Sequence, residues 1–159
     1  MQTITQTSAT ERSITAIRTF DAPKRLVWRA YTEPDLIRRW WVCDTMTMTV
    51  CDVDLRVGGE YRYVARVASG EEVPMKGTFS EVTPPDRLLC TQIYDVAPYN
   101  EHAADVTVTL TEKDAQTELV TKIVFPTVDS YEGAAATGME AGMGVTIDRL
   151  ADVVGDLAA

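Results

Sequence analysis

The C-terminal stretch of the chain, from Tyr131 to Leu157, repeats apolar residues at the spacing of an α-helix. Steps of three or four residues place one set on a single helix side: Met139, Met143, Ile147, Leu150, Val154 and Leu157. At about 1.5 Å per residue, this helix would be on the order of 40 Å long, enough to cross a small domain. We therefore expect a long helix that packs one apolar side against the rest of the chain.

The first half of this predicted helix is rich in glycine, with Gly133, Gly138, Gly142 and Gly144. Each glycine costs roughly 1 kcal/mol relative to alanine in a helix interior. A helix that tolerates so many glycines needs positions without side chains, either for close approach of another backbone or to leave room beside it. We predict that it seals a core at one end and borders a cavity at the other. A glycine-weakened helix without a cavity remains the alternative.

Composition and charge narrow the class of protein. The chain has 159 residues, 45% of them hydrophobic and 25% charged, as in an ordinary globular domain. We expect a flexible, threonine-rich lead-in at residues 1–12 and a single domain over 13–159. A net charge of −9 disfavours nucleic acids and anionic membrane surfaces, and no apolar run is long enough to insert in a membrane. Cys43, Cys51 and Cys90 lack a Cys-x-x-Cys spacing, which favours a reducing cytoplasm.

The N-terminal part predicts a strand followed by two short helices. Ser13–Phe20 carries the β-branched and apolar residues of a strand. Asp21 is a candidate N-cap, with Pro23 near the first turn of a helix over Lys24–Thr32. Pro34 cannot continue that helix comfortably and begins a second one that extends to Trp40.

The middle of the chain has the two-residue period of β-strands. Short turns separate the candidate segments, which are Met46–Cys51, Tyr61–Val67, Met75–Val82, Arg87–Asp95, Val106–Leu110 and Thr117–Phe125. Short connections imply antiparallel neighbours, because parallel pairs need a long crossover. The predicted fold class is therefore α+β, a curved antiparallel sheet of about seven strands around the long C-terminal helix, with two short helices after the first strand.

Several motifs, in order along most of the chain, carry a family resemblance. They are Arg18–Pro23 with Val27-Trp28, Thr32–Pro34 with Leu36 and Trp40-Trp41, Asp54–Gly59 with Tyr61-Arg62, Gly77, Glu81–Leu88, Gly138–Glu140, Gly142 and Asp148–Leu150. The chain resembles the bacterial proteins named after the C-terminal domain of the activator of the ninety-kilodalton heat-shock chaperone's ATPase, within the START-like (SRPBCC) superfamily.

This resemblance implies a helix-grip fold, in which a seven-stranded sheet curls around a C-terminal helix and two small helices close the other side. It also implies regulation of a chaperone ATPase as one function. The family's last helix usually reads Gly-Trp where this chain has Gly142-Met143. Because methionine is smaller and more adaptable than tryptophan, a cavity bordered by Met143 would be larger or softer.

Candidates for catalysis are sparse. His102 is the chain's single histidine and falls in a loose segment, where a solvated loop residue is the simpler interpretation. Asp52 and Asp54 share a strand face, either as an acid–base pair or as charges that end a strand. Gly58-Gly59 predicts a tight turn and lacks the context of a phosphate loop. We expect no catalytic residue, metal site or cofactor.

The preferred site is an apolar cavity under the last helix. Its predicted lining is aromatic and methionine-rich: Trp40, Trp41, Tyr61, Tyr63, Phe79, Tyr94, Met139 and Met143. Tyr61 and Tyr63 stand out because an inward hydroxyl needs a polar partner. If Trp40-Trp41 is extended, the two side chains point in opposite directions, and at most one of them lines the cavity.

Three functions remain open. The first is non-enzymatic binding of a small apolar or amphipathic molecule. The second is a protein-interaction module with a chaperone partner. The third is an enzyme of the cyclase or hydrolase type, with Tyr61, Tyr63 and Asp52 as candidate residues, because related START-like folds include such enzymes. A homodimer is also compatible with an open sheet edge or an exposed tryptophan.

Overall fold

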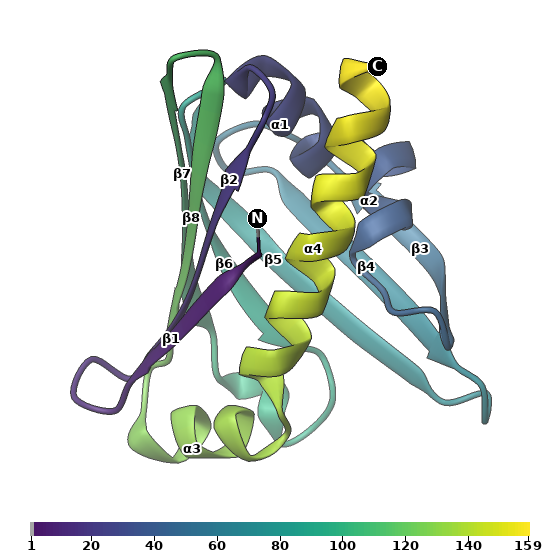
Figure 1. Ribbon diagram of the computed structural model, residues 1–159. Coiled ribbons are helices and arrows are strands. Elements are labelled where there is room, and N and C mark those ends of the chain that lie inside the picture. The colour runs from purple at the N-terminus through teal and green to yellow at the C-terminus, as the bar shows by residue number, and fades with distance from the viewer. Residues whose placement is uncertain (1) are drawn as a thin grey trace.

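The computed structural model describes residues 2–159, which form a strongly curved antiparallel sheet around a long helix (Figure 1). The strands follow the order β1-β2-β8-β7-β6-β5-β4-β3 across the sheet. They are β1 (Ile4–Ser8), β2 (Ser13–Phe20), β3 (Met46–Val53), β4 (Glu60–Val67), β5 (Glu72–Thr83), β6 (Arg87–Tyr94), β7 (Ala104–Lys113) and β8 (Gln116–Val124). The helices are α1 (Lys24–Thr32), α2 (Pro34–Trp40), the short 3-10 helix η1 (Tyr99–Glu101), α3 (Val128–Ala136) and α4 (Met139–Ala158).

Helix α4 closes the open side of the curved sheet. It packs against β1 and β2 on one side and against α1 and α2 on the other. Its second half is the anchored part, with Ile147, Leu150, Val153 and Val154 fully buried in the core. The α+β helix-grip architecture expected from the sequence is therefore confirmed, with one more strand than expected.

The two short helices occupy the predicted residues, but the predicted cap is wrong. The residue that precedes α1 is Pro23, whose backbone is extended and whose side chain makes no cap hydrogen bond. The backbone N–H of Lys24 donates instead to the carboxylate of Glu112 on β7, at 2.6 Å. Asp21 lies two residues too early to serve as the N-cap. Pro34 begins α2, as expected from its fixed φ angle. The indole N–H of Trp40 donates to the carbonyl oxygen of Ala30 at 2.8 Å, which ties α2 to α1.

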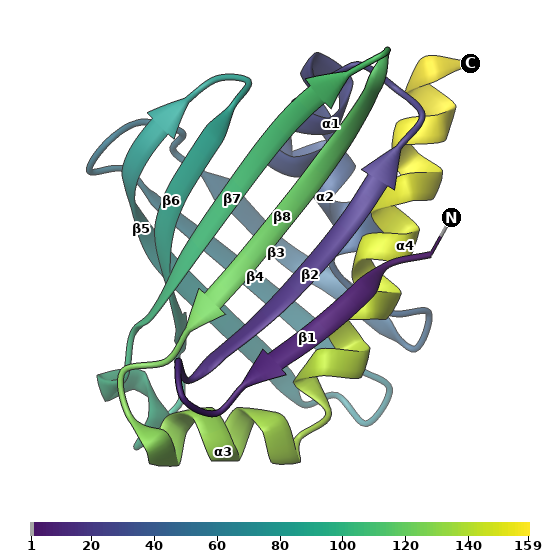
Figure 2. The same ribbon diagram turned by 60° about the vertical axis from the view of Figure 1, so that its left-hand side comes forward.

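Part of the expected N-terminal lead-in is a strand, because residues 4–8 form the edge strand β1. Ile4 pairs with Ile17 and Ser8 with Ser13 in an antiparallel register. The backbone N–H and the hydroxyl of Thr3 both donate to Asp148 on α4, at 3.2 and 2.6 Å. Figure 2 shows β1 as the outermost strand, alongside α4. Pairing with β2 and polar contacts to α4 therefore order a segment that has no apolar face of its own.

The predicted C-terminal helix is two helices rather than one. Helix α3 begins at a capping box, in which Thr127 accepts a hydrogen bond from the backbone N–H of Ser130. The break falls at Gly138, whose φ of 80° is left-handed and ends the helical path before α4 starts. Helix α3 lies across one end of the curved sheet and α4 (Figures 1 and 2). Within residues 2–159, none of the helices is long and apolar enough to cross a bilayer.

Candidate ligand-binding site

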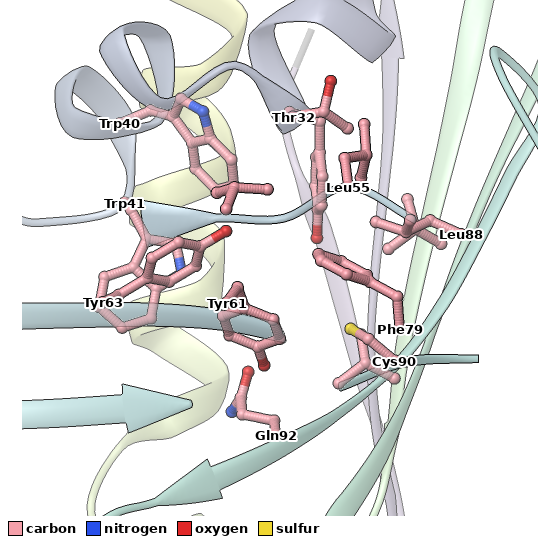
Figure 3. Close-up of a pocket in the computed structure, with 14 residues that line it drawn as sticks. Thr32, Trp40, Trp41, Leu55, Tyr61, Tyr63, Phe79, Leu88, Cys90 and Gln92 are labelled. Carbon is pink, nitrogen blue, oxygen red and sulfur yellow. The ribbon is translucent and has the colours of Figure 1, made fainter. Parts of the chain in front are cut away.

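A small pocket lies between the concave face of the sheet and the ends of α1 and α2 (Figure 3). Its free volume is about 50 Å³. The lining comes from α1, the end of α2, the five neighbouring strands β3 to β7 and the loop after β3: Tyr31, Thr32, Trp40, Trp41, Val53, Leu55, Tyr61, Tyr63, Phe79, Leu88, Cys90, Gln92, Val106 and Val108. None of these side chains is ordinarily charged, and six of them are aromatic. The pocket is therefore apolar with a few hydroxyl, thiol and amide groups.

The position of Tyr61 depends on the glycine opposite it. Tyr61 pairs with Gly77 across β4 and β5. A Cβ atom at residue 77 would lie 2.5 Å from Cε1 of the Tyr61 ring and 1.9 Å from the Thr91 carbonyl oxygen. The absence of a side chain at Gly77 therefore lets the phenol ring lie across β5. Its hydroxyl reaches β6, where it donates to the Thr91 carbonyl at 2.6 Å.

Aromatic rings form a continuous wall along the pocket. The centroid of the Trp41 ring is 5.1 Å from that of Tyr63, and the Tyr63 and Tyr61 rings are 4.8 Å apart. Tyr61 continues the contact to Phe79 at 5.5 Å. Edge-on and tilted ring pairs at these distances are each worth about 0.5–1.5 kcal/mol beyond area burial. The wall is thus a surface against which an apolar group can pack.

The tyrosine hydroxyl groups in the pocket stay protonated. Burial raises the pKa of Tyr31, Tyr61 and Tyr63 above the ordinary value of a phenol. Burial also raises the pKa of Cys90 to about 12, although the neighbouring Tyr61 hydroxyl partly opposes that shift. At neutral pH the pocket therefore presents neutral hydrogen-bonding groups, with no phenolate or thiolate nucleophile.

The structure brings together five of the eight residues in the predicted lining. Trp40, Trp41, Tyr61, Tyr63 and Phe79 all border the pocket. Three predicted residues lie outside this lining. Tyr94 is 38% exposed at the end of β6 and stacks on Tyr99, with ring centroids 5.8 Å apart. Met139 and Met143 on α4 pack at the edge of the core.

Both tryptophans border the pocket, contrary to the expectation for an extended pair. That expectation assumed that neighbouring side chains point in opposite directions. Trp41 instead has helical backbone angles at the end of α2, with φ of −70° and ψ of −19°. Consecutive helical residues are separated by about 100° around the axis, so both indoles can face the same hollow.

The candidate catalytic residues do not meet in the pocket. Asp52 is exposed and pairs with Arg62 across β3 and β4, on the sheet face opposite to Tyr61 and Tyr63. Asp54 forms an ion pair with Arg56 in the following turn. His102 is exposed after the short helix η1. The pocket therefore has tyrosine hydroxyls but neither the imidazole nor the carboxylate that would activate a nucleophile or water.

Sequence reasoning missed the part of the pocket that comes from α1, β6 and β7. Tyr31 lies on the apolar side of α1, a pattern that indicates burial without indicating a cavity. On β6, Leu88, Cys90 and Gln92 alternate with residues that point outward. This two-residue period was the signal that could have identified them as inward-facing. Cys90 pairs with both Phe79 and Val106, so the three form one inward row across β5, β6 and β7. The strand order needed to recognise that row is a tertiary property.

A second hollow, of about 190 Å³, lies between β2 and α4, beyond the last residue pair of β1 and β2. Its aromatic content is limited to Phe20, and its lining includes the charged residues Arg18 and Asp21. Arg18 is already engaged by an ion pair with Asp148. This hollow offers a small molecule less aromatic contact than the inner pocket.

The fold and the pocket between sheet and helices define a helix-grip domain of the START-like (SRPBCC) type. A family model described as Activator of Hsp90 ATPase homolog 1-like protein matches residues 21–155. The chain belongs to this family. None of the proteins with curated functions matches it.

Solved bacterial structures share the architecture over nearly the whole chain. A protein from Nitrosomonas europaea is 28% identical, with 92% of this chain and 96% of that chain covered and a TM-score of 0.81. A protein from Arthrobacter aurescens is 23% identical, with coverage of 96% and 91% and a TM-score of 0.86. An AHSA1-like protein from Aeromonas hydrophila is 23% identical, with coverage of 92% and 94% and a TM-score of 0.71. These last two similarities concern the fold alone.

Proposed function

We propose that this protein binds a small apolar or amphipathic molecule in the pocket between the sheet and the ends of α1 and α2. The observation that carries the proposal is the continuous aromatic wall of Trp41, Tyr63, Tyr61 and Phe79 beside an apolar hollow. Small-molecule sites are typically concave and apolar, with a few polar groups that fix orientation. The absence of an activating histidine or carboxylate from the lining favours binding over catalysis.

The size of the pocket adds a requirement to this function. Its 50 Å³ is smaller than the cavity of about 150 Å³ that holds benzene in an engineered protein core. Ligand binding therefore has to enlarge the pocket by moving side chains. Trp41 and Tyr63 are the natural candidates, because both are only partly buried at the edge of the core.

Ethylbenzene, a small neutral probe, tests the proposal in an NMR titration of the whole protein. A matched pair of substitutions locates the binding. Val108→Phe would fill the pocket from β7, where Val108 is 2% exposed, whereas Val57→Phe adds the same bulk to a residue that is 67% exposed. We expect binding to the wild type and to Val57→Phe, and its loss in a folded Val108→Phe variant. No binding to the wild type, or equal binding to both variants, would contradict the proposal.

Regulation of a chaperone ATPase is the second candidate, because the family description names activation of the Hsp90 ATPase. A cluster of exposed apolar side chains, Tyr94, Val96 and Tyr99, gives a surface for protein contact. Addition of this protein to its host's Hsp90-type chaperone should raise the ATPase rate, and Tyr99→Ala should reduce that effect. An unchanged rate at saturating protein concentration would argue against this candidate.

A further inference from the structure

Polar groups without protein partners gather on the inner side of the pocket. The hydroxyl oxygen of Thr121 is buried and has no hydrogen-bond partner within residues 2–159. Thr121 on β8 pairs with Val108 on β7, and Val108 pairs with Leu88 on β6. Directly paired residues share a sheet face, so Thr121 faces the same side as two side chains that line the pocket.

Two tyrosine hydroxyls accompany Thr121. The hydroxyl of Tyr31 lies near that of Thr121, without hydrogen-bond geometry between them. The hydroxyl of Tyr63 points into the pocket, toward the rings of Trp40 and Tyr61 (Figure 3). Within the described residues 2–159, neither tyrosine hydroxyl donates to a protein atom, in contrast to Tyr61, which donates to Thr91.

These groups select for a particular kind of ligand atom. Of these three groups, only the Thr121 hydroxyl is both fully buried and without a partner. A ligand that supplies a partner to any of the three adds a hydrogen bond that the protein itself does not make. Because burial keeps both tyrosines protonated, their hydroxyls can donate to an oxygen acceptor at any physiological pH. The lining contains no lysine, arginine or histidine, so a carboxylate or phosphate would lose its hydration without gaining a counter-ion.

We infer that the pocket is built for an uncharged ligand that carries a carbonyl-type oxygen, which accepts hydrogen bonds from the hydroxyls of Tyr31 and Tyr63. The apolar remainder of the ligand packs on the aromatic wall formed by Trp41, Tyr61, Tyr63 and Phe79. This inference rests on the proposed binding function and adds the chemical class of the ligand. It also assigns a function to Tyr31, which the sequence pattern identifies only as an apolar-side helix residue.

Three probes of nearly equal shape separate the inference from the proposed function. Acetophenone is neutral and has a carbonyl oxygen, ethylbenzene is neutral without an acceptor, and benzoate is charged. We expect acetophenone to bind about tenfold more tightly than ethylbenzene, and benzoate to bind more weakly than either. Equal binding of acetophenone and ethylbenzene would overturn the inference and leave the proposed function standing. Tightest binding of benzoate would overturn the inference, and the absence of binding by all three would overturn both.

Removal of the two hydroxyls tests whether they recognise the acceptor. The double variant Tyr31→Phe/Tyr63→Phe keeps the rings and should bind acetophenone and ethylbenzene equally. Tyr94→Phe removes a hydroxyl from an exposed tyrosine outside the pocket lining and should keep the tenfold preference. The infrared carbonyl band of bound, ¹³C-labelled acetophenone should move to higher wavenumber in the double variant, because its hydrogen bonds are lost. An unchanged preference and an unchanged band would overturn the inference.

Discussion

Substitution of Gly77 by alanine tests how closely the packing of the pocket depends on one missing side chain. The added Cβ would lie 2.5 Å from Cε1 and 2.7 Å from Cζ of the Tyr61 ring, both well inside van der Waals contact. It would also lie 1.9 Å from the carbonyl oxygen of Thr91, a backbone atom that cannot move without disturbing β6. Either the ring leaves its place across β5 or the two strands separate.

The expected loss of stability combines the cost of overpacking with the loss of one hydrogen bond. Overpacking of this kind costs about 1–3 kcal/mol. Displacement of the ring also breaks the 2.6 Å hydrogen bond from Tyr61 to Thr91, which is worth about 0.5–1.5 kcal/mol. We therefore expect the free energy of unfolding to fall by about 2–4 kcal/mol in urea denaturation. The corresponding fall in Tm is about 5–15 °C for a domain of this size.

Gly142→Ala is the matched control. Gly142 lies inside α4, and a Cβ there would meet nothing within 4 Å. The same substitution should raise the free energy of unfolding by about 0.5–1 kcal/mol, since alanine is the better helix former. A Gly77→Ala variant within about 0.5 kcal/mol of the wild type would refute the described packing of Tyr61.

Three further predictions concern the surface and the helix ends. Iodoacetamide should label Cys43 before Cys90, because a hydrogen bond with a neighbouring threonine lowers the pKa of Cys43 while burial raises that of Cys90. Peptide mass spectrometry after brief exposure to the reagent gives the order of labelling. Equal labelling of the two cysteines would contradict the prediction. Thr127→Ala removes the cap of α3 and should cost about 0.5–2 kcal/mol locally, measured as faster hydrogen exchange in that helix; unchanged exchange would show that the cap is dispensable. Hydrogen bonding by Arg62 holds the pKa of Asp95 below its usual value, so its contribution to stability is complete above about pH 4 and is lost as the pH falls through the folded-state pKa. The difference in unfolding free energy between wild type and Asp95→Asn should therefore shrink on acidification, and a constant difference would contradict this assignment.

The helices and most strands were predictable because local patterns and tertiary structure agree. Pro34 separates α1 from α2, and period-two alternation marks the strands from β3 onward. Strand β1 was not predictable, because it is stabilised by β2 and by contacts from Thr3 and Thr5 to α4 carboxylates. The break between α3 and α4 was hidden, because the apolar spacing of three and four residues extends from Met139 without revealing that Gly138 is left-handed.

The pocket residues on the strands were predictable where the alternation of inward and outward side chains can be read from the sequence. Tyr61, Tyr63 and Phe79 point inward, as their alternation suggests. Tyr94 has the same parity, since it shares a row with Met75 and Tyr63, but it lies where the sheet ends and the surface opens. The methionines of α4 do not line the pocket, for a different reason. That helix packs over β1, β2, α1 and α2, whereas the pocket lies farther along the sheet, toward β4 and β6.

The most direct test of ligand binding is the detection of intermolecular nuclear Overhauser effects between bound ethylbenzene and the aromatic ring protons of the protein. The pocket account predicts contacts to Tyr61, Phe79 and Trp41, whose rings form its wall. Saturable binding with contacts confined to the exposed rings of Tyr94 and Tyr99 would contradict the account and place the apolar site on the surface.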